Sequence, residues 1–412
     1  MIDYYETKQH PITKKMVLDA YKVVRANKGS AGVDDESLDE FATNATGNLY
    51  KLWNRLTSGS YHPPAVKEVA IPKRSKGIRY LGIPSVSDRI AQQVVKSYIE
   101  PKIEIHFHEN SYGYRPRKSA HHALRQTTVN CSYYGWAVDL DIKSFFDSID
   151  HELLMKAIRC FVNDKWVLMY IERWLKAGVS RDGVIYAREK GTPQGGVISP
   201  ILANVFMHFV FDKWMEKNHP NMPFERYCDD AIIHCTTERQ ASFIKSVVAK
   251  RLAQCKLELN DAKTHIVYCR NHVHREYYPN TRAKFDFLGY TFRPIRFKSQ
   301  EQWKFSFLPC MSESSKNEVR ITLRKLIVRG MRYSIEQIAE VLNPKIRGWY
   351  QYYHKFTTWT TRGLWYWLNQ KLANWIKNYR RTSIKKARDL MVRMYETRPH
   401  LFAHWVNVRP YR

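Results

Sequence analysis

The stretch Glu225-Arg-Tyr-Cys-Asp-Asp-Ala-Ile-Ile-His-Cys235 joins two short strand-like runs through a pair of adjacent aspartates. Residues 225–228 and 231–235 have the length and composition of strands, so together they predict a β-hairpin. Asp229 and Asp230 then lie at its turn. Because turns favour aspartate for local reasons, this segment alone fits an ordinary structural turn as well as a reactive site.

A third carboxylate is predicted close to this turn. The run Ala137-Val-Asp-Leu-Asp-Ile142 alternates in polarity and predicts a half-buried strand that carries Asp141. Adjacent strands lie about 4.8 Å apart, so an aspartate on one strand can face the turn of a neighbouring hairpin. Mg²⁺ is a hard ion that takes one or two carboxylates together with water and phosphate oxygens. Two such ions about 4 Å apart can activate a 3′-hydroxyl and neutralise a phosphate during phosphodiester synthesis.

The charge balance points to a polyanionic partner. The 412 residues include 67 Lys and Arg against 39 Asp and Glu, a net charge of +28, and 26 Tyr, 12 Trp and 18 Phe offer rings for base stacking. Residues 293–412 alone contain 25 basic and 7 acidic residues. This concentration favours a nucleic-acid-binding region over the alternative, a solvated basic surface with the aromatic rings in the core.

Periodicity along the chain predicts mixed secondary structure. Helices and strands should alternate up to about residue 305, after which the pattern becomes helical, with capping boxes at 315–318 and 334–337. The elements that matter most below are helices at 13–26, 87–100 (ending before Pro101), 201–214, 344–356, 362–381 and 383–396, and strands at 65–72, 77–84 and 265–268.

Features of targeting or covalent cross-linking are not found in the sequence. Apolar runs stay short of a membrane span, residues 1–15 lack the apolar core of a secretory signal, and the seven cysteines show no paired spacing. We therefore expect a cytoplasmic protein, in a bacterial cytosol or the equivalent organelle matrix.

Taken together, the motifs resemble the reverse transcriptases of the group II intron maturase family. The core match consists of three segments in the family's order: Asp141-Ile-Lys-Ser-Phe-Phe-Asp147, Gly191-Thr-Pro-Gln-Gly-Gly-Val-Ile-Ser-Pro200 and Tyr227-Cys-Asp-Asp230. Further matches extend the resemblance over nearly the whole chain, at residues 27–34, 71–84, 111–116, 287–290 and 343–353. Cys228 departs from the Ala that is common in intron-encoded members, which puts mobility in doubt and leaves polymerisation untouched.

The resemblance implies an α+β right-hand polymerase. Its fingers and palm, an antiparallel sheet plus helices, would be followed by an all-helical thumb or maturase domain. The implied divisions are an N-terminal extension at 1–64, fingers and palm at 65–304, the helical domain at 305–405 and a short tail at 406–412. No cysteine follows Cys310, so the resemblance is to members lacking the HNH endonuclease domain.

The resemblance also implies the residues that hold metal ions. Asp141, Asp229 and Asp230, with the backbone carbonyl of Ile142, would bind two Mg²⁺ ions, for which Mn²⁺ is a substitute. Lys263 would protonate the pyrophosphate leaving group, and its alternative is an ordinary surface lysine.

Other positions would bind the incoming nucleotide. Lys73 and Arg79 would grip the triphosphate, with a solvated basic hairpin as the alternative. Phe146 would press against the sugar 2′ position and exclude ribonucleotides, unless it is a plain core residue. Gln194 would line the nucleotide pocket. RNA binding is assigned to basic residues of the helical domain, namely Arg320, Arg324, Lys325, Arg347, Arg380, Arg381, Lys385 and Lys386.

The function implied is reverse transcription combined with maturase activity. The partners would be an RNA template with a DNA primer, dNTPs, a structured group II intron RNA whose splicing it assists, and a DNA target for retrohoming; monomer and homodimer both stay open. Two alternatives remain: a host-adopted reverse transcriptase in DNA repair or phage defence, and an RNA-binding splicing cofactor without polymerisation. Primer extension on an RNA template would distinguish the splicing cofactor, which makes no product. Ribozyme-like RNA encoded in the DNA flanking the gene would distinguish an intron-encoded enzyme from a host-adopted one.

Overall fold

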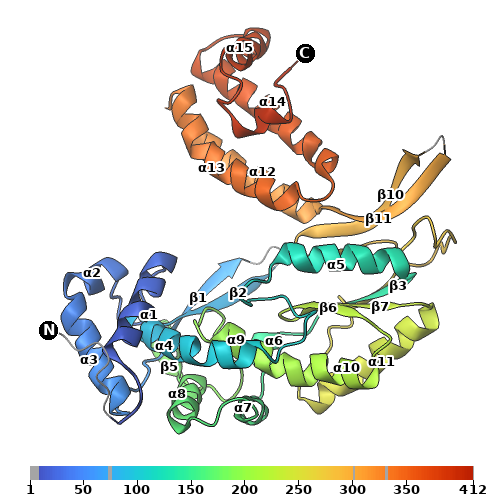
Figure 1. The fold of residues 1–412 in the computed structure, drawn as a ribbon. Helices are drawn as coiled ribbons and strands as arrows, with labels where there is room; N and C mark the ends of the chain where they lie inside the picture. Colours follow the sequence, from blue (N-terminus) through green and yellow to red (C-terminus); the bar gives the residue numbers. More distant parts are fainter. Residues whose placement is uncertain (1–8, 73–76, 300–301, 330–332, 412) are drawn as a thin grey trace. The chain divides into compact units, whose positions relative to one another are not determined.

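The computed structural model describes residues 9–72, 77–299, 302–329 and 333–411. The chain divides into two compact units. The first unit comprises residues 1–123 and 137–266, and the second comprises 124–136 and 267–412. Figure 1 identifies the elements of each unit. The α+β class predicted from the sequence is confirmed, because helices and sheets with both antiparallel and parallel pairings build the first unit, and helices dominate the second.

The first unit begins with a helical cluster. Helices α1 (Lys14–Asn27), α2 (Leu38–Thr43) and α3 (Ala45–Thr57) form this cluster, and α1 packs against α4 (Val86–Glu104). Thr13 caps α1 by accepting a hydrogen bond from the Met16 amide, and this confirms the helix predicted over 13–26.

Helix α4 corrects one expectation, because it runs through Pro101 to Glu104 instead of ending before the proline. The extra turn buries Ile103 completely. This burial offsets the hydrogen bond that a proline removes from a helix close to its end.

Two four-stranded sheets complete the first unit. The first has the order β2-β1-β4-β5, built from β1 (Val66–Pro72), β2 (Ile78–Ile83), β4 (Val179–Arg181) and β5 (Val184–Tyr186). The antiparallel pairing of β1 with β2 confirms the two strands predicted there. The second has the order β6-β7-β3-β8, built from β3 (Trp136–Leu140), β6 (Phe224–Tyr227), β7 (Asp230–Cys235) and β8 (His265–Tyr268). The boundary between the units falls within strands β3 and β8.

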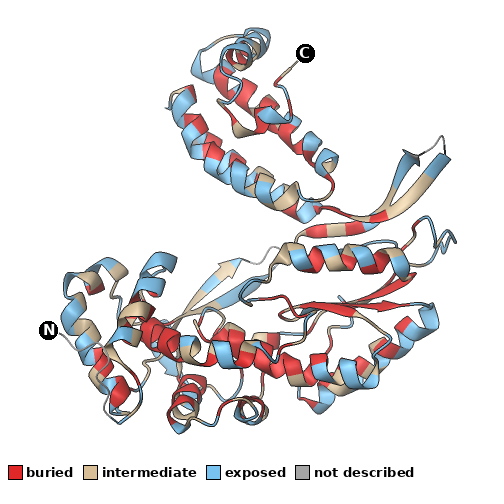
Figure 2. Cartoon of the chain, in the orientation of Figure 1, coloured by how far each residue is buried: buried red, intermediate tan, exposed pale blue. Residues whose placement is uncertain are grey.

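The helices that lie between the strands of the second sheet along the chain supply much of the first unit's core. They are α6 (Phe145–Ser148), α7 (His151–Arg159), α8 (Lys165–Lys176), α9 (Ser199–Met207), α10 (Lys213–Asn218) and α11 (Glu238–Gln254). Helices α9, α10 and α11 lie along one face of the sheet (Figure 1), and buried residues concentrate on its strands and on α4 and α9 (Figure 2). The helix predicted over 201–214 is interrupted by a π-helical turn, η1 (His208–Asp212).

The second unit contains a three-stranded sheet of order β11-β10-β9, from β9 (Phe285–Phe287), β10 (Tyr290–Ser299) and β11 (Gln302–Met311). The expectation of helix from residue 305 was wrong, because strand pairing continues to Met311 opposite Tyr290. Short apolar runs such as 305–308 do not by themselves distinguish a strand from a helix. Helix α5 (Ala120–Tyr133) crosses from the first unit into the second.

Four long helices follow in the second unit: α12 (Glu313–Arg329), α13 (Ile335–Tyr353), α14 (Arg362–Tyr379) and α15 (Ile384–Thr397). The capping box at Ser334 is confirmed, but Pro344 lies inside α13 rather than at its start. The predicted cap at Ser315 was wrong: Ser312 accepts the Ser315 amide at 3.1 Å, and the Ser315 hydroxyl instead donates to the Gly289 carbonyl at 3.0 Å. Within the described ranges, no helix is both long and apolar enough to cross a membrane.

Candidate active site

The predicted hairpin is present, and its turn is acidic. Strands β6 and β7 pair antiparallel with Tyr227 opposite Asp230, so Cys228 and Asp229 form a two-residue turn. Cys228 has a φ of 63°, in the left-handed region that residues other than glycine rarely adopt. Strand β3 pairs next to β7, and Asp141 follows directly after β3. The three carboxylates therefore lie at the same part of one sheet.

Their electrostatics show how close they are. Burial, together with the charges of Asp229 and Asp141, raises the pKa of Asp230 to about 7. Burial also raises the pKa of Asp229, with a contribution from Asp141. Asp230 retains an exposed surface, so solvent screening weakens this repulsion. Such a group gains from a bound cation, because a cation favours the charged carboxylates.

The segment before β8 holds Asp141 in place. Its carboxylate accepts hydrogen bonds from the Asn260 amide group at 2.8 Å and from the Lys263 ammonium at 3.4 Å. Its backbone carbonyl accepts the Asn260 amide at 2.8 Å, and its own amide donates to the Thr264 hydroxyl at 3.3 Å. Ile142 is buried next to it. The structure thus places Lys263 directly at the acidic cluster.

The donor chemistry suits divalent cations. Within the described part of the chain, no group of three or more His, Cys, Asp or Glu residues forms a site that could hold a metal ion. Magnesium does not require such a cage, because it keeps several waters and shares phosphate oxygens with its substrate. Asp141, Asp229 and Asp230 offer only hard oxygen donors, and burial and neighbouring charge raise the pKa of Asp229 and of Asp230, so this cluster matches that requirement.

A second group of residues lies between α6 and the turn at 191–196. Thr192 donates its amide to the Phe146 carbonyl at 2.8 Å, and the Gln194 side-chain amide donates to the Asp147 carboxylate at 3.2 Å. Gly195 has a φ of 125°, and a Cβ there would lie 2.5 Å from the Gly82 carbonyl oxygen of β2. The turn therefore connects Phe146 and Gln194 to the β1–β2 hairpin.

Arg79 links the two groups electrostatically. It lies exposed on β2, and its charge partly opposes the rise that burial causes in the pKa of Asp229, of Asp230 and of Asp147. Lys73, its predicted partner in triphosphate binding, lies outside the described residues.

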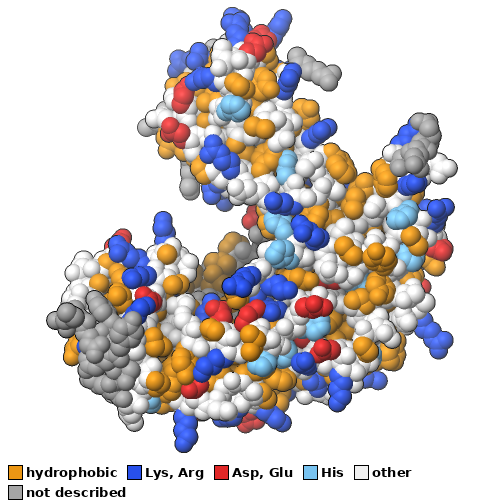
Figure 3. All heavy atoms as spheres, viewed as in Figure 1, with side chains coloured by type: hydrophobic (Ala, Val, Ile, Leu, Met, Phe, Trp, Pro, Cys, Tyr) orange, Lys and Arg blue, Asp and Glu red, His pale blue; other side chains and the backbone are white. Residues whose placement is uncertain are grey.

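The predicted RNA-binding residues all belong to the helices of the second unit, on α12, α13, α15 and the α14–α15 connection. Figure 3 shows Lys and Arg side chains spread over this helical part. Seven of the eight are exposed, and Arg320 is half-buried and donates to Asn317 at 3.0 Å. Arg324 lies over the Trp367 ring at 5.3 Å.

Three residues of the site escaped the sequence analysis. Asn260 holds Asp141, Asp147 holds Gln194, and Arg226 is completely buried beneath the acidic turn. A signal existed for Arg226, because charged residues within a predicted strand are buried only when they are paired. Asn260 is brought to Asp141 across a sequence separation of 119 residues, which no local pattern reveals.

Two known protein families match most of the chain. Residues 71–292, more than half of the sequence, match the family described as reverse transcriptase (RNA-dependent DNA polymerase). Residues 316–393 match the family described as group II intron, maturase-specific domain. Members of the first family generally use divalent metal ions.

Individual relatives agree with these matches. Protein YkfC of Escherichia coli is 35% identical over 208 residues, covering 49% of this chain and 54% of that protein. The group II intron-encoded protein LtrA of Lactococcus lactis is 32% identical over 255 residues, covering 59% of this chain and 41% of that protein. The matched segments thus span about half of these relatives. Telomerase from Candida albicans aligns with 90% of this chain and 69% of its own at a TM-score of 0.48 and 11% identity, too weak a likeness to bear on fold or function.

Proposed function

Because this chain belongs to the reverse transcriptase (RNA-dependent DNA polymerase) family, we propose that it is an RNA-directed DNA polymerase that extends a DNA primer on an RNA template with dNTPs. The observation that carries the proposal is the acidic turn of the β6–β7 hairpin. There, burial together with repulsion from Asp229 and Asp141 raises the pKa of Asp230 to about 7. A structural turn gains nothing from such crowding, whereas a cation-binding site does.

Asp141, Asp229 and Asp230, with the Ile142 carbonyl, would hold two Mg²⁺ ions or the substitute Mn²⁺. Bound there, the ions supply activation of the primer 3′-hydroxyl and neutralise charge on the transferred phosphate. Lys263 contacts Asp141 and is close enough to the cluster to lower the pKa of Asp230, so it can deliver a proton to the leaving pyrophosphate.

The remaining residues of the site bind and select the nucleotide. Arg79, together with Lys73, would grip the triphosphate, because a planar guanidinium forms paired hydrogen bonds to phosphate oxygens. Gln194, oriented by Asp147, lines the pocket, and Phe146 restricts the sugar 2′ position. These roles are supported by the contacts that join Phe146, Asp147 and Gln194 within the first unit.

A second candidate activity is maturase function. The match of residues 316–393 to the maturase-specific domain favours it, as do the exposed cations of α12–α15. These helices would bind a structured group II intron RNA. We assign them to a helical domain at 305–405. The other assigned parts are an extension at 1–64, fingers and palm at 65–304, and a tail at 406–412. The protein would then assist splicing and copy the RNA at a DNA target. Structured RNA is recognised mostly through shape, phosphates and 2′-hydroxyls, which suits a basic surface.

Primer extension tests the principal proposal. Purified protein should extend a DNA primer annealed to an RNA template when Mg²⁺ and dNTPs are present, and should stop when EDTA removes the ion. Absence of any product, with RNA binding intact, would favour the splicing cofactor instead. Binding to group II intron RNA over a size-matched unstructured RNA tests the maturase assignment separately.

A further inference from the structure

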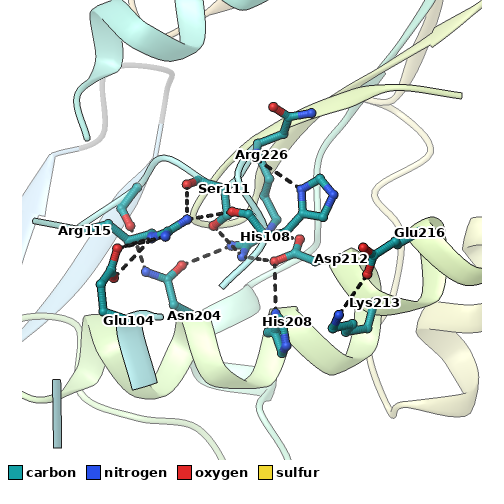
Figure 4. Close-up of polar contacts among 12 residues, drawn as sticks. Glu104, His108, Ser111, Arg115, Asn204, His208, Asp212, Lys213, Glu216 and Arg226 are labelled. Atoms are coloured by element: carbon teal, nitrogen blue, oxygen red, sulfur yellow. Dashed lines mark hydrogen bonds and ion pairs between the residues drawn. The ribbon is translucent and has the colours of Figure 1, made fainter. Parts of the chain in front are cut away.

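Beneath the acidic turn, Arg226 forms a fully buried polar network (Figure 4). Its Nε and Nη2 donate to the two carboxylate oxygens of Asp212, each at 2.6 Å. Its Nη1 donates to the Asn204 side-chain oxygen at 3.1 Å, and Nη2 also donates to the Ser111 hydroxyl at 2.7 Å. The fifth N–H bond runs from Nη1 to the Cys228 carbonyl at 2.8 Å. All five donors of the guanidinium are therefore used.

The last of these contacts reaches the catalytic turn itself. Cys228 precedes Asp229 and has the left-handed φ of 63°. A residue other than glycine keeps that conformation only where its surroundings hold it. Arg226 fixes the Cys228 carbonyl, and therefore the peptide plane from which Asp229 and Asp230 project.

The other side of the turn is held by the same network. Asn204 donates to the Gly113 carbonyl at 2.7 Å, and a Cβ at Gly113 would lie only 2.6 Å from the Cys228 amide nitrogen. The segment containing Gly113 also pairs with β6, since Arg226 donates its amide to Asn110 at 2.9 Å and Tyr112 donates to the Arg226 carbonyl at 2.8 Å. The turn thus accepts a hydrogen bond at the Cys228 carbonyl, and the Gly113 backbone packs closely against the Cys228 amide.

The anchor of the network depends on an irregularity in the helix. Asp212 ends the π-helical turn His208–Asp212, between α9 and α10. A π-turn inserts one residue into an α-helix and rotates everything after it, and such turns occur frequently at functional sites. Asn204, which lies before the π-turn, and Asp212, which ends it, both face Arg226 (Figure 4).

We propose that Arg226 is a positioning residue for the metal-binding carboxylates: anchored by Asp212, it holds the Cys228 peptide so that Asp229 and Asp230 can share divalent cations with Asp141. This inference rests on the proposed polymerase function, because it explains how the acidic turn keeps its geometry. Arg226 itself is completely buried and contacts neither nucleic acid nor nucleotide.

The test uses four variants of the full chain. The double variant Arg226→Met/Asp212→Leu removes both buried charges and leaves no unpaired ion. Arg226→Lys keeps the positive charge but lacks the five N–H donors of the guanidinium. Gly113→Ala places a methyl group against the Cys228 amide and leaves the Arg226 side chain unchanged. The matched control is Arg173→Met, because Arg173 also donates to two backbone carbonyls, those of Gly59 and Tyr61, away from the turn.

Two quantities are measured for each variant bound to RNA template and DNA primer: Mn²⁺ affinity, from the electron paramagnetic resonance of free Mn²⁺, and the rate of single-nucleotide addition at saturating dNTP. We expect the double variant to weaken Mn²⁺ binding at least tenfold and to slow addition at least 100-fold, with template–primer affinity within twofold of wild type. Arg226→Lys should recover part of both losses, Gly113→Ala should weaken Mn²⁺ binding severalfold, and Arg173→Met should change neither.

A folded double variant with wild-type Mn²⁺ affinity and rate would reduce Arg226 to a core ion pair. Should the double variant not fold, Arg226→Lys and Gly113→Ala decide, and unchanged Mn²⁺ affinity in both overturns the inference. A wild-type protein that binds Mn²⁺ but makes no DNA contradicts the proposed polymerase function instead, and the Mn²⁺ measurements still decide the role of Arg226.

Discussion

The acidic turn of the first unit and the basic helices of the second hold their charges in opposite ways. Around Asp229 and Asp230 the charges are crowded, and beneath them all five donors of the buried Arg226 have specific partners. On α12–α15 most cations are exposed and their partners are few. A crowded site makes each residue irreplaceable, whereas an exposed surface adds small, screened contributions. The comparison teaches that the first unit should determine chemistry and the second affinity.

The largest effect is expected at the acidic turn. Asp230→Asn should lower DNA synthesis at least 10³-fold, because the variant loses one of the three carboxylates that would hold the metal ions. RNA affinity should stay within about twofold, since the helices of the second unit are untouched. Primer extension and filter binding on the same preparation measure both. Activity of Asp230→Asn within a few-fold of wild type would contradict the conclusion that the acidic turn of the first unit determines the chemistry.

For the basic helices of the second unit we expect the reverse: a loss of RNA affinity with little change in catalytic rate. Replacing Arg380, Arg381, Lys385 and Lys386 together with alanine should weaken RNA binding by about tenfold to 10²-fold while the turnover at saturating RNA stays near wild type. The slope of log K against log salt should become shallower by roughly 0.7 to 0.9 for each phosphate that the variant no longer neutralises.

The control for this variant is an equal number of exposed lysines on first-unit helices, at Lys156, Lys165, Lys217 and Lys250. Equal losses of RNA affinity from both sets would mean that only total charge matters and that the helical surface is not special.

A smaller effect is expected at the nucleotide pocket. Phe146 is half-buried on α6, with its carbonyl bonded to Thr192. Phe146→Val should raise ribonucleotide incorporation relative to dNTP by about tenfold to 10²-fold, because a smaller side chain leaves room for the 2′-hydroxyl. Competing dNTP and rNTP incorporation measures the ratio. Phe243→Val, at an exposed phenylalanine of α11, should leave it unchanged, and an unchanged ratio at Phe146 would assign that ring to the core.

The smallest effect on activity is expected at Asp88, where titration changes stability instead. Asp88 is buried on α4 and accepts hydrogen bonds from Tyr61, Trp174 and Gln92. Burial raises its pKa to about 6 from 3.8, so the folded protein binds a proton that the unfolded chain has released. Stability contributed by this group is therefore present at low pH and lost as pH rises from about 4 to 6, by roughly 3 kcal/mol.

Asp88→Asn removes this titration. Denaturant unfolding between pH 4 and 7 should show the stability of wild type, relative to the variant, falling over that window. Glu336→Gln provides the opposite case, because the hydrogen bond from Arg398 lowers the pKa of this exposed carboxylate. The stability of wild type relative to Glu336→Gln should therefore rise slightly with rising pH. Parallel curves for wild type and Asp88→Asn would contradict the assignment of Asp88.

Local patterns predicted the elements whose cause is local. The β6–β7 hairpin, helix α1 and the capping box at Ser334 depend on alternation, turn residues and caps within a few positions. The errors occurred where packing overrides local preference. Helix α4 passes Pro101 because Ile103 is buried, and β11 is a strand because β10 pairs with it.

By itself, the sequence determined the negative charge of the 229–230 turn, the positive charge of the helices in the second unit, and the order of the motifs. Residue identity and spacing are properties of the chain alone. Only the tertiary structure decided which distant groups meet: Asn260 with Asp141, Asp147 with Gln194, and Asp212 with Arg226 beneath the turn. The reason is physical. A buried polar group must find a partner, and that partner is set by the packing of sheets and helices rather than by distance along the chain.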